Sequence, residues 1–310
     1  MTLPPLLRDR LSLPLIGSPM FIISQPDLVI AQCRSGIVGA LPSLNARPSG
    51  MFERWLQQLG EALTEQDAPF AVNLIVHRTN TRLEEDLELC VRYRVPIVIT
   101  SLGAREDVNQ AIHSYGGIVL HDVINNMFAR KAVEKGADGL IAVAAGAGGH
   151  AGTLSPFALV QEIRQWFDGP LALSGAIATG RAIAAARMMG ADLGYMGTPF
   201  IATEEANAQA AYKQMIVDGS AQDIVYSDVF TGVLGNYLRP SIVAAGLDPD
   251  ALPKAKDMDF ASLTGGEKKA WRDVWGAGQG IGAIAKVQPA ADFIAGLKAD
   301  YRAAVEGFTA

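Results

Sequence analysis

The chain has 310 residues, of which 49% are hydrophobic and 19% charged, so it is long enough to bury the core of one large α/β domain. Its 26 basic and 32 acidic residues are interspersed, with a formal net charge of −6, and no basic block follows a phosphate backbone, which argues against nucleic-acid binding. No stretch reaches about 18 uninterrupted apolar residues, and the first residues lack an export signal, so we expect no membrane span. Cys33 and Cys90 are interpreted as reduced core thiols of a cytoplasmic protein.

Short apolar, β-branched runs alternate with amphipathic stretches from residue 13 to about residue 216. The expected strands are 13–17, 37–41, 70–75, 95–100, 117–121, 138–143, 170–174 and 192–196. The expected helices are 25–35, 49–65, 80–92, 104–115, 125–135, 156–167, 179–189 and 203–216. Eight pairs in roughly 200 residues favour a (β/α)8 TIM barrel over the alternative, a doubly wound open sheet.

Two turns repeat the same tripeptide between a helix and the next strand. They are Lys135-Gly-Ala-Asp138 and Met189-Gly-Ala-Asp192, and each glycine suits a helix C-cap. The strands that follow such turns, for example 139–143, are apolar on both faces, as expected of parallel strands covered by helices.

The rhythm changes beyond residue 216. We expect residues 1–216 to form the barrel and residues 217–310 a mostly helical extension that packs on it and contributes to the active site. Residues 217–285 are expected to be helical or irregular and to lie over the barrel mouth, and a last amphipathic helix is expected at 289–306.

Functional residues of such barrels follow the C-terminal ends of the strands. After the first strand, Ser18-Pro-Met20 offers backbone groups and a polarisable thioether that suit a flat aromatic ligand; taken alone, the segment is better explained as an ordinary strand-terminating turn. The amide of Asn73, on the third strand, can donate and accept at once and so can pair with a heterocycle edge. A buried loop-capping Asn is the alternative.

A glycine-rich segment, Gly146-Ala-Gly-Gly-His-Ala-Gly152, follows the sixth strand. Its glycines allow a planar ligand to approach the backbone, with His150 above it. Imidazole titrates near pH 6.5 in the absence of other influences, so His150 can take a proton from a carbon acid or bind an anionic substrate. A structural histidine is the alternative. The match to a dinucleotide fingerprint is discounted because Ser155-Pro156 delays the helix and the seventh strand ends without an acidic residue.

Glycine-containing turns follow the last two strands, at Ser174-Gly-Ala-Ile-Ala-Thr-Gly180 and Met196-Gly-Thr-Pro199. Loops in these positions commonly bind phosphate through backbone N–H groups. His121 ends the fifth strand, where it either lines the pocket or supports a lining residue. No group of His, Asp and Glu has metal-ligand spacing, so we expect no metal.

These segments resemble the nitronate monooxygenase family, formerly called 2-nitropropane dioxygenases, which are FMN-dependent (β/α)8 enzymes. The resemblance runs from about Pro14 to Glu205 and returns at Trp275-Gly-Ala-Gly-Gln-Gly280. It implies that Ser18, Pro19, Met20 and Asn73 contact the isoalloxazine or ribityl part and that Gly148 lies beside the ring. By the same likeness Gly175, Ala176, Gly197 and Thr198, next to Met196, hold the phosphate, and Gln279 and Gly280 approach the flavin.

The resemblance implies oxidation of an alkyl nitronate, or of a nitroalkane deprotonated by His150, through FMN and O2 to a carbonyl compound and nitrite. His150 is then either a base or an electrostatic partner. The chain departs from the family at Ala176, where a second glycine is usual, and residues 217–270 offer little to align, so substrate identity does not carry over.

Two other functions stay open. One is an NAD(P)H-dependent FMN reductase acting on a quinone or an enoyl thioester. The other is a non-redox phosphate-sugar isomerase or synthase on the same barrel. The sequence also leaves open whether the chain forms a homo-oligomer.

Overall fold

Eight parallel strands form a barrel in the computed structural model, which describes residues 3–252 and 273–309. The sheet order is β1-β9-β8-β6-β5-β4-β3-β2, and the N–H of Gly17 closes the circle by donating to the carbonyl of Val38 at 2.8 Å. The strands are β1 (Leu15–Gly17), β2 (Gly39–Pro42), β3 (Phe70–Ile75), β4 (Ile97–Ser101), β5 (Ile118–Val123), β6 (Gly139–Val143), β8 (Leu171–Ser174) and β9 (Leu193–Met196). The predicted TIM barrel is therefore confirmed.

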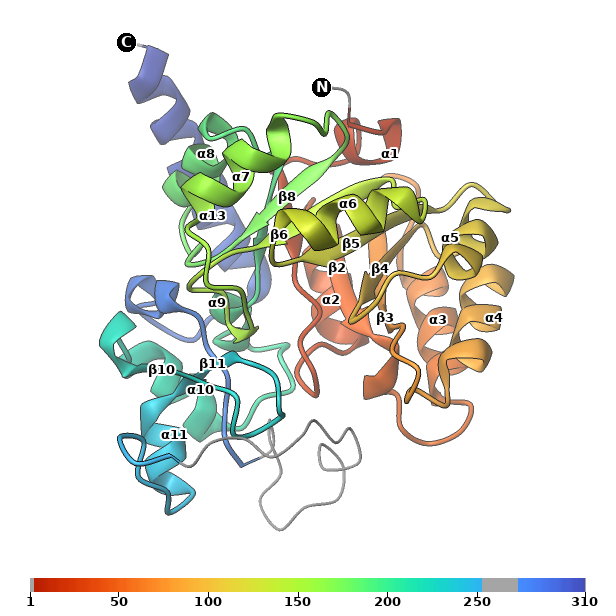
Figure 1. The fold of residues 1–310 in the computed structure, drawn as a ribbon. Coiled ribbons are helices and arrows are strands. Elements are labelled where there is room, and N and C mark those ends of the chain that lie inside the picture. Colours follow the sequence, from red (N-terminus) through yellow and green to blue (C-terminus); the bar gives the residue numbers. More distant parts are fainter. Residues whose placement is uncertain (1–2, 253–272, 310) are drawn as a thin grey trace.

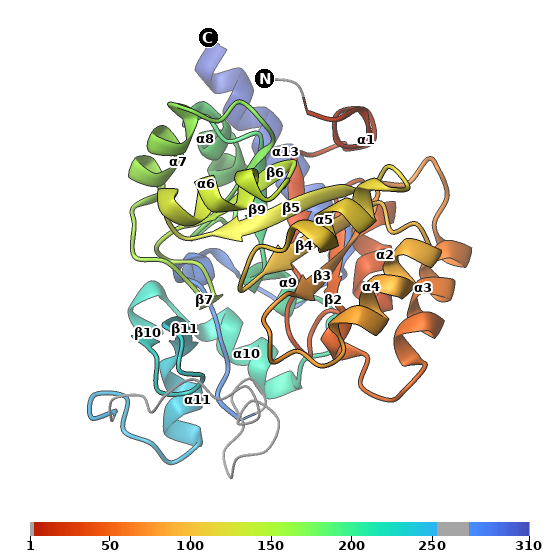
Figure 2. The same cartoon turned by 45° about the vertical axis from the view of Figure 1, so that its right-hand side comes forward.

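Helices surround this barrel (Figures 1 and 2). Several begin where the sequence offers a cap: Asn125 accepts the N–H of Phe128, Thr179 accepts that of Ala182, and prolines open α2 and α7. The helices that follow the first seven barrel strands are α2 (Pro26–Arg34), α3 (Met51–Ala62), α4 (Leu83–Arg92), α5 (Glu106–His113), α6 (Asn126–Glu134), α7 (Pro156–Arg164) and α8 (Gly180–Met188).

The eighth helix differs from the expectation of 203–216. Two helices, α9 (Thr198–Ile201) and α10 (Ala210–Asp218), stand in its place. The backbone between them bonds to distant segments: the N–H of Glu204 donates to Gln288 O and that of Asn207 to Ile23 O. Those contacts replace the local bonds of a helix, a tertiary effect that amphipathic spacing does not reveal.

The floor of the barrel is an apolar layer. Ile16, Ala71, Leu120 and Leu193 project inward from different strands and are buried at 0–1% exposure. Leu7 from the short helix α1 (Pro5–Arg8) packs against this layer at the N-terminal end of the strands. The interior is thus a filled core below the functional end.

The two Gly-Ala-Asp turns each end a helix and link the next strand to its neighbour. Gly136 and Gly190 adopt φ of 91° and 113°, as a left-handed C-cap requires. Asp138 then accepts the N–H of Val119 at 2.7 Å, and Asp192 accepts that of Leu171 at 2.9 Å. Each aspartate therefore ties the start of one strand to its neighbour.

The C-terminal region contains a small sheet that the sequence analysis did not foresee. β10 (Ile224–Ser227) and β11 (Gly235–Leu238) pair antiparallel, and β11 also pairs with β7 (Gly149–His150). Helix α11 (Arg239–Ala244) follows, and Figure 1 shows this group at the end of the molecule opposite both termini. Residues 253–272 of the predicted extension lie outside the described residues.

The last helix, α13 (Ala290–Thr309), agrees with the expectation of 289–306 and lies on the barrel wall against α8 and α2. Both cysteines are buried and free. No helix within the described ranges has the length and apolar character needed to cross a bilayer.

The close contact between α8 and α13 requires that Gly180 has no Cβ atom, and this requirement can be tested. A Cβ there would overlap the backbone atoms Leu297 O and Tyr301 N, which cannot move independently of α13. We expect Gly180→Ala to lower the free energy of unfolding by about 1–3 kcal/mol in urea titrations. The control Gly296→Ala lies within α13 with open space around it and should be neutral or gain about 0.5–1 kcal/mol. Equal stabilities of the two variants would contradict this packing.

Candidate active site

A cavity of about 490 Å³ lies at the C-terminal ends of the barrel strands. Side chains two residues beyond the apolar floor line it, because successive inward positions on a strand are two residues apart. Asn73 follows Ala71, Asp122 follows Leu120, and Tyr195 follows Leu193 in this way. Its volume falls in the range of small-molecule and cofactor sites.

His150 enters this cavity from β7 rather than from a barrel strand. Pairing with Gly235 of β11 fixes its backbone, and its Nε2 lies 2.9 Å from Thr231 Oγ1. The Thr231 hydroxyl also lies within hydrogen-bond distance of the carbonyl of Val233, at 3.0 Å. Burial lowers the pKa of His150 to about 4, so the ring is neutral at pH 7.

A second, narrow cavity of about 20 Å³ continues from the first beside the ends of β8 and β9. Both cavities share Gly148, Gly197 and Thr198 in their linings. A Cβ on Gly148 would lie 2.8 Å from Gly278 N, and one on Gly197 would lie 2.5 Å from Ser18 Oγ. The glycines therefore permit close approach of the loops as well as space for a ligand.

A directed chain of hydrogen bonds crosses three strands at the cavity wall. Asn73 Nδ2 donates to Ser101 Oγ at 2.7 Å, and Ser101 Oγ donates to Asp122 Oδ2 at 2.6 Å. Burial raises the pKa of Asp122 to about 6, against the Ser101 hydrogen bond, which lowers it. The sequence analysis did not single out Asp122 or Tyr195.

His121 lies on the other face of β5 and does not line the cavity. It is buried at 5% exposure, with Nδ1 2.6 Å from Thr100 Oγ1, and burial lowers its pKa to about 4. Strand periodicity could have separated it from Asp122, since Leu120 and Asp122 share the inward face.

The loop after β1 covers part of the cavity in a constrained conformation. Ile22 has φ of 70°, which is unfavourable for a β-branched residue. Asn45 holds the loop: its Oδ1 accepts the N–H of Ile22 at 2.7 Å, and its Nδ2 donates to the carbonyls of Met20 and Ser24. Met20 and its neighbours are thus fixed before a ligand binds.

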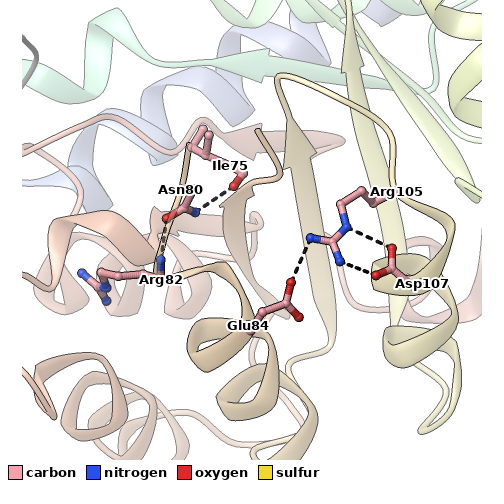
Figure 3. Close-up of polar contacts among 6 residues, drawn as sticks. All are labelled: Ile75, Asn80, Arg82, Glu84, Arg105 and Asp107. Atoms are coloured by element: carbon pink, nitrogen blue, oxygen red, sulfur yellow. Dashed lines mark hydrogen bonds and ion pairs between the residues drawn. The ribbon is translucent and has the colours of Figure 1, made fainter. Parts of the chain in front are cut away.

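Two arginines, Arg47 and Arg82, also line the cavity. Asn80 donates to Ile75 O and accepts the N–H of Arg82, which places Arg82 after β3, as Figure 3 shows. Arg82 also pairs with the buried Asp86 at 2.9 Å. In the same figure Arg105, in the loop after β4, forms ion pairs with Glu84 of α4 and Asp107 of α5. Arg105 does not line the cavity.

Most predicted site residues come together here. The wide cavity is lined by Ser18, Pro19, Met20, Asn73, Gly148, His150, Gly197 and Thr198, and the narrow one also by Gly175, Ala176 and Gly280. Two do not join them through their side chains. Met196 packs in the core, where only its carbonyl serves the site by accepting Ser18 N–H at 2.8 Å, and Gln279 is exposed.

The sequence is similar to those of several known proteins. The family model described as nitronate monooxygenase matches residues 78–300. A nitronate monooxygenase of Paraburkholderia phytofirmans is 25% identical, covering 94% of this chain and 93% of that protein. A hydroxy-methyl-oxo-octahydro-indene carboxyl-CoA dehydrogenase of Rhodococcus jostii is 24% identical, covering 74% of this chain and 64% of that protein.

A solved structure shares the fold. The nitroalkane oxidase of Streptomyces ansochromogenes superposes with a TM-score of 0.79 at 22% identity, covering 98% of this chain and 99% of that one.

The buried His121 gives a prediction for stability at acid pH. Its pKa of about 4 in the folded protein lies below the value near 6.5 of an unfolded chain, so its contribution is complete above pH 6.5 and is lost as pH falls toward 4. His121→Asn should therefore lie below the wild type in unfolding free energy at pH 7.5, with the gap narrowing by about 3 kcal/mol toward pH 4. Burial raises the pKa of Asp122, which gives the unfolding free energy the opposite pH dependence. Because both proteins contain Asp122, its contribution cancels when His121→Asn is compared with the wild type. A gap independent of pH would refute the assignment.

Proposed function

The chain belongs to the nitronate monooxygenase family of oxidoreductases, and from this membership we propose that it binds FMN and oxidises alkyl nitronates, or nitroalkanes, with O2 to a carbonyl compound and nitrite. One observation carries the proposal: His150 lines a wide cavity that continues into a narrow, glycine-lined one at the ends of β8 and β9. A planar ring with a phosphate tail has this shape.

The residues present fit FMN. The wide cavity suits the ring, with Met20 and Asn73 in its lining, and the narrow cavity suits the phosphate. Ala176 lines the narrow cavity, and its N–H donates to Gly146 O at 3.2 Å. Thr198 Oγ1 accepts the N–H of Gly278 at 2.8 Å, which leaves its own hydroxyl proton to donate to a phosphate oxygen.

The bound flavin would accept electrons from the substrate and pass them to O2, while His150 would accept the proton that a nitroalkane loses. A neutral imidazole has one ring nitrogen without a proton, and this form of the ring can act as a base on a nitroalkane. A ring that is neutral at pH 7 offers no full positive charge to a nitronate. The lowered pKa of His150 therefore keeps the ring in the form that a base requires at pH 7.

The competing function is an NAD(P)H-dependent reductase of a quinone or enoyl thioester, which the similarity to a carboxyl-CoA dehydrogenase favours. Anaerobic stopped-flow mixing with NADH, NADPH and propionate 3-nitronate separates the two. We expect flavin bleaching by the nitronate. Bleaching by a nicotinamide alone would reject the monooxygenase, and a protein that takes up no FMN would favour the non-redox class.

Replacing His150 tests its role. His150→Asn should lower kcat/KM for a neutral nitroalkane by about 10²–10⁴-fold, because proton abstraction is lost. On the preformed nitronate the loss should be less than about tenfold, since no C–H proton has to be removed. Steady-state oxygen consumption measures both substrates. Equal losses on both would contradict a role confined to proton abstraction.

Replacing Gly278 tests the narrow cavity. A Cβ there would lie 2.6 Å from Gly146 O and 2.8 Å from Gly148 N, so both loops must shift. Gly278→Ala should weaken FMN binding at least tenfold, about 1.4 kcal/mol, in fluorescence titrations of the deflavinated protein. In the control, Gly282→Ala, the nearest atom would be Ser220 Cα at 3.8 Å, an ordinary contact, so its affinity should be unchanged. Unchanged affinity in Gly278→Ala would place the phosphate elsewhere.

A further inference from the structure

Asp122 presents an unused oxygen at the cavity wall. It is half-buried at the C-terminal end of β5, and its Oδ2 accepts the hydroxyl of Ser101. Ser101 in turn accepts from Asn73, so its single proton is committed to Asp122 and cannot turn away. Oδ1 has no hydrogen-bond partner within residues 3–252 and 273–309. The carboxyl group is therefore held in place on one side and open on the other.

The surroundings give Asp122 no compensating cation. Tyr195 on β9 is close enough for Asp122 to raise its pKa, in addition to the larger effect of burial. Among the described residues no Lys, Arg or His forms an ion pair with Asp122. The cavity lining also includes Asn73, Val143 of β6, His150 of β7, Arg47 and Arg82. The pKa of Asp122 is set by burial and by the Ser101 hydrogen bond, not by these groups.

We propose that Asp122 takes up a proton whenever negative charge appears in the cavity, acting as a carboxylate toward a neutral ligand and as a hydrogen-bond donor toward an anion. The proton comes from solvent and forms an O–H bond at Oδ1, because Oδ2 is occupied by Ser101. Asp122 is neither oxidised nor reduced. The inference rests on the proposed function, since the negative charge is that of a nitronate or of a flavin that has gained electrons.

Electrostatics supports a switch in the neutral range. Burial raises the pKa of Asp122 to about 6, and an anion within a few ångströms raises it further by about 1–3 units. Burial lowers the pKa of His150 to about 4, so the two groups titrate in the reverse of their usual order. Asp122 is then the cavity group that changes charge near pH 7.

Electrochemical titration of the FMN-loaded protein tests the proposal. The slope of the flavin midpoint potential against pH gives the protons taken up per two electrons. Between about pH 6.5 and 8 the wild type should take up about one more proton than Asp122→Asn. The amide of Asp122→Asn keeps the shape of the side chain but cannot titrate. Tyr195→Phe, which removes the neighbouring hydroxyl but keeps the carboxyl group, is the matched control and should retain the extra proton.

Equal proton uptake in the wild type and Asp122→Asn would overturn the inference. If Asp122→Asn does not retain flavin, Ser101→Ala provides the test: losing the hydrogen bond that favours the carboxylate should move the extra uptake to higher pH, and an unmoved window would overturn the inference. A wild-type protein that binds no flavin would instead reject the proposed function on which the inference rests.

Discussion

The two-residue period of a parallel strand is the constraint on which the rest of the site depends. One inward position on each strand belongs to the apolar floor, and the next inward position belongs to the cavity wall. Ala71 and Asn73, Leu120 and Asp122, and Leu193 and Tyr195 are such pairs. A slip of one residue would turn Asp122 outward and bring His121 into the cavity, so the barrel register itself selects which polar groups face a ligand.

The position of His150 depends on a second, longer-range constraint. Its two-residue strand β7 is held by β11, which follows 85 residues later in the chain, and its ring contacts Thr231 in the connection between β10 and β11. The barrel alone would leave the glycine-rich loop without this support. The C-terminal addition thereby helps to fix the imidazole, and burial lowers the pKa of His150 so that the ring is neutral at pH 7.

Strand and helix positions within the barrel could be predicted because apolar runs, prolines and the Gly-Ala-Asp turns are local signals. The meeting of Ser18, Asn73, Gly148 and Thr198 followed from the rule that parallel strands end at one rim. The β10–β11 pair could not be found in this way, since its strands are short and bind β7 far away in sequence. Met196 shows the limit of a motif: the motif lies at the site, but its side chain faces the core.

The central claim is that a flavin lies in the wide cavity beside His150 with its phosphate between the ends of β8 and β9. A crystal structure of the purified protein soaked with FMN tests this most directly. The account predicts the tricyclic ring within contact of Met20 and the His150 imidazole, and the phosphate near Gly197 and Thr198. A phosphate bound outside the narrow cavity, or an imidazole turned away from the ring, would contradict it.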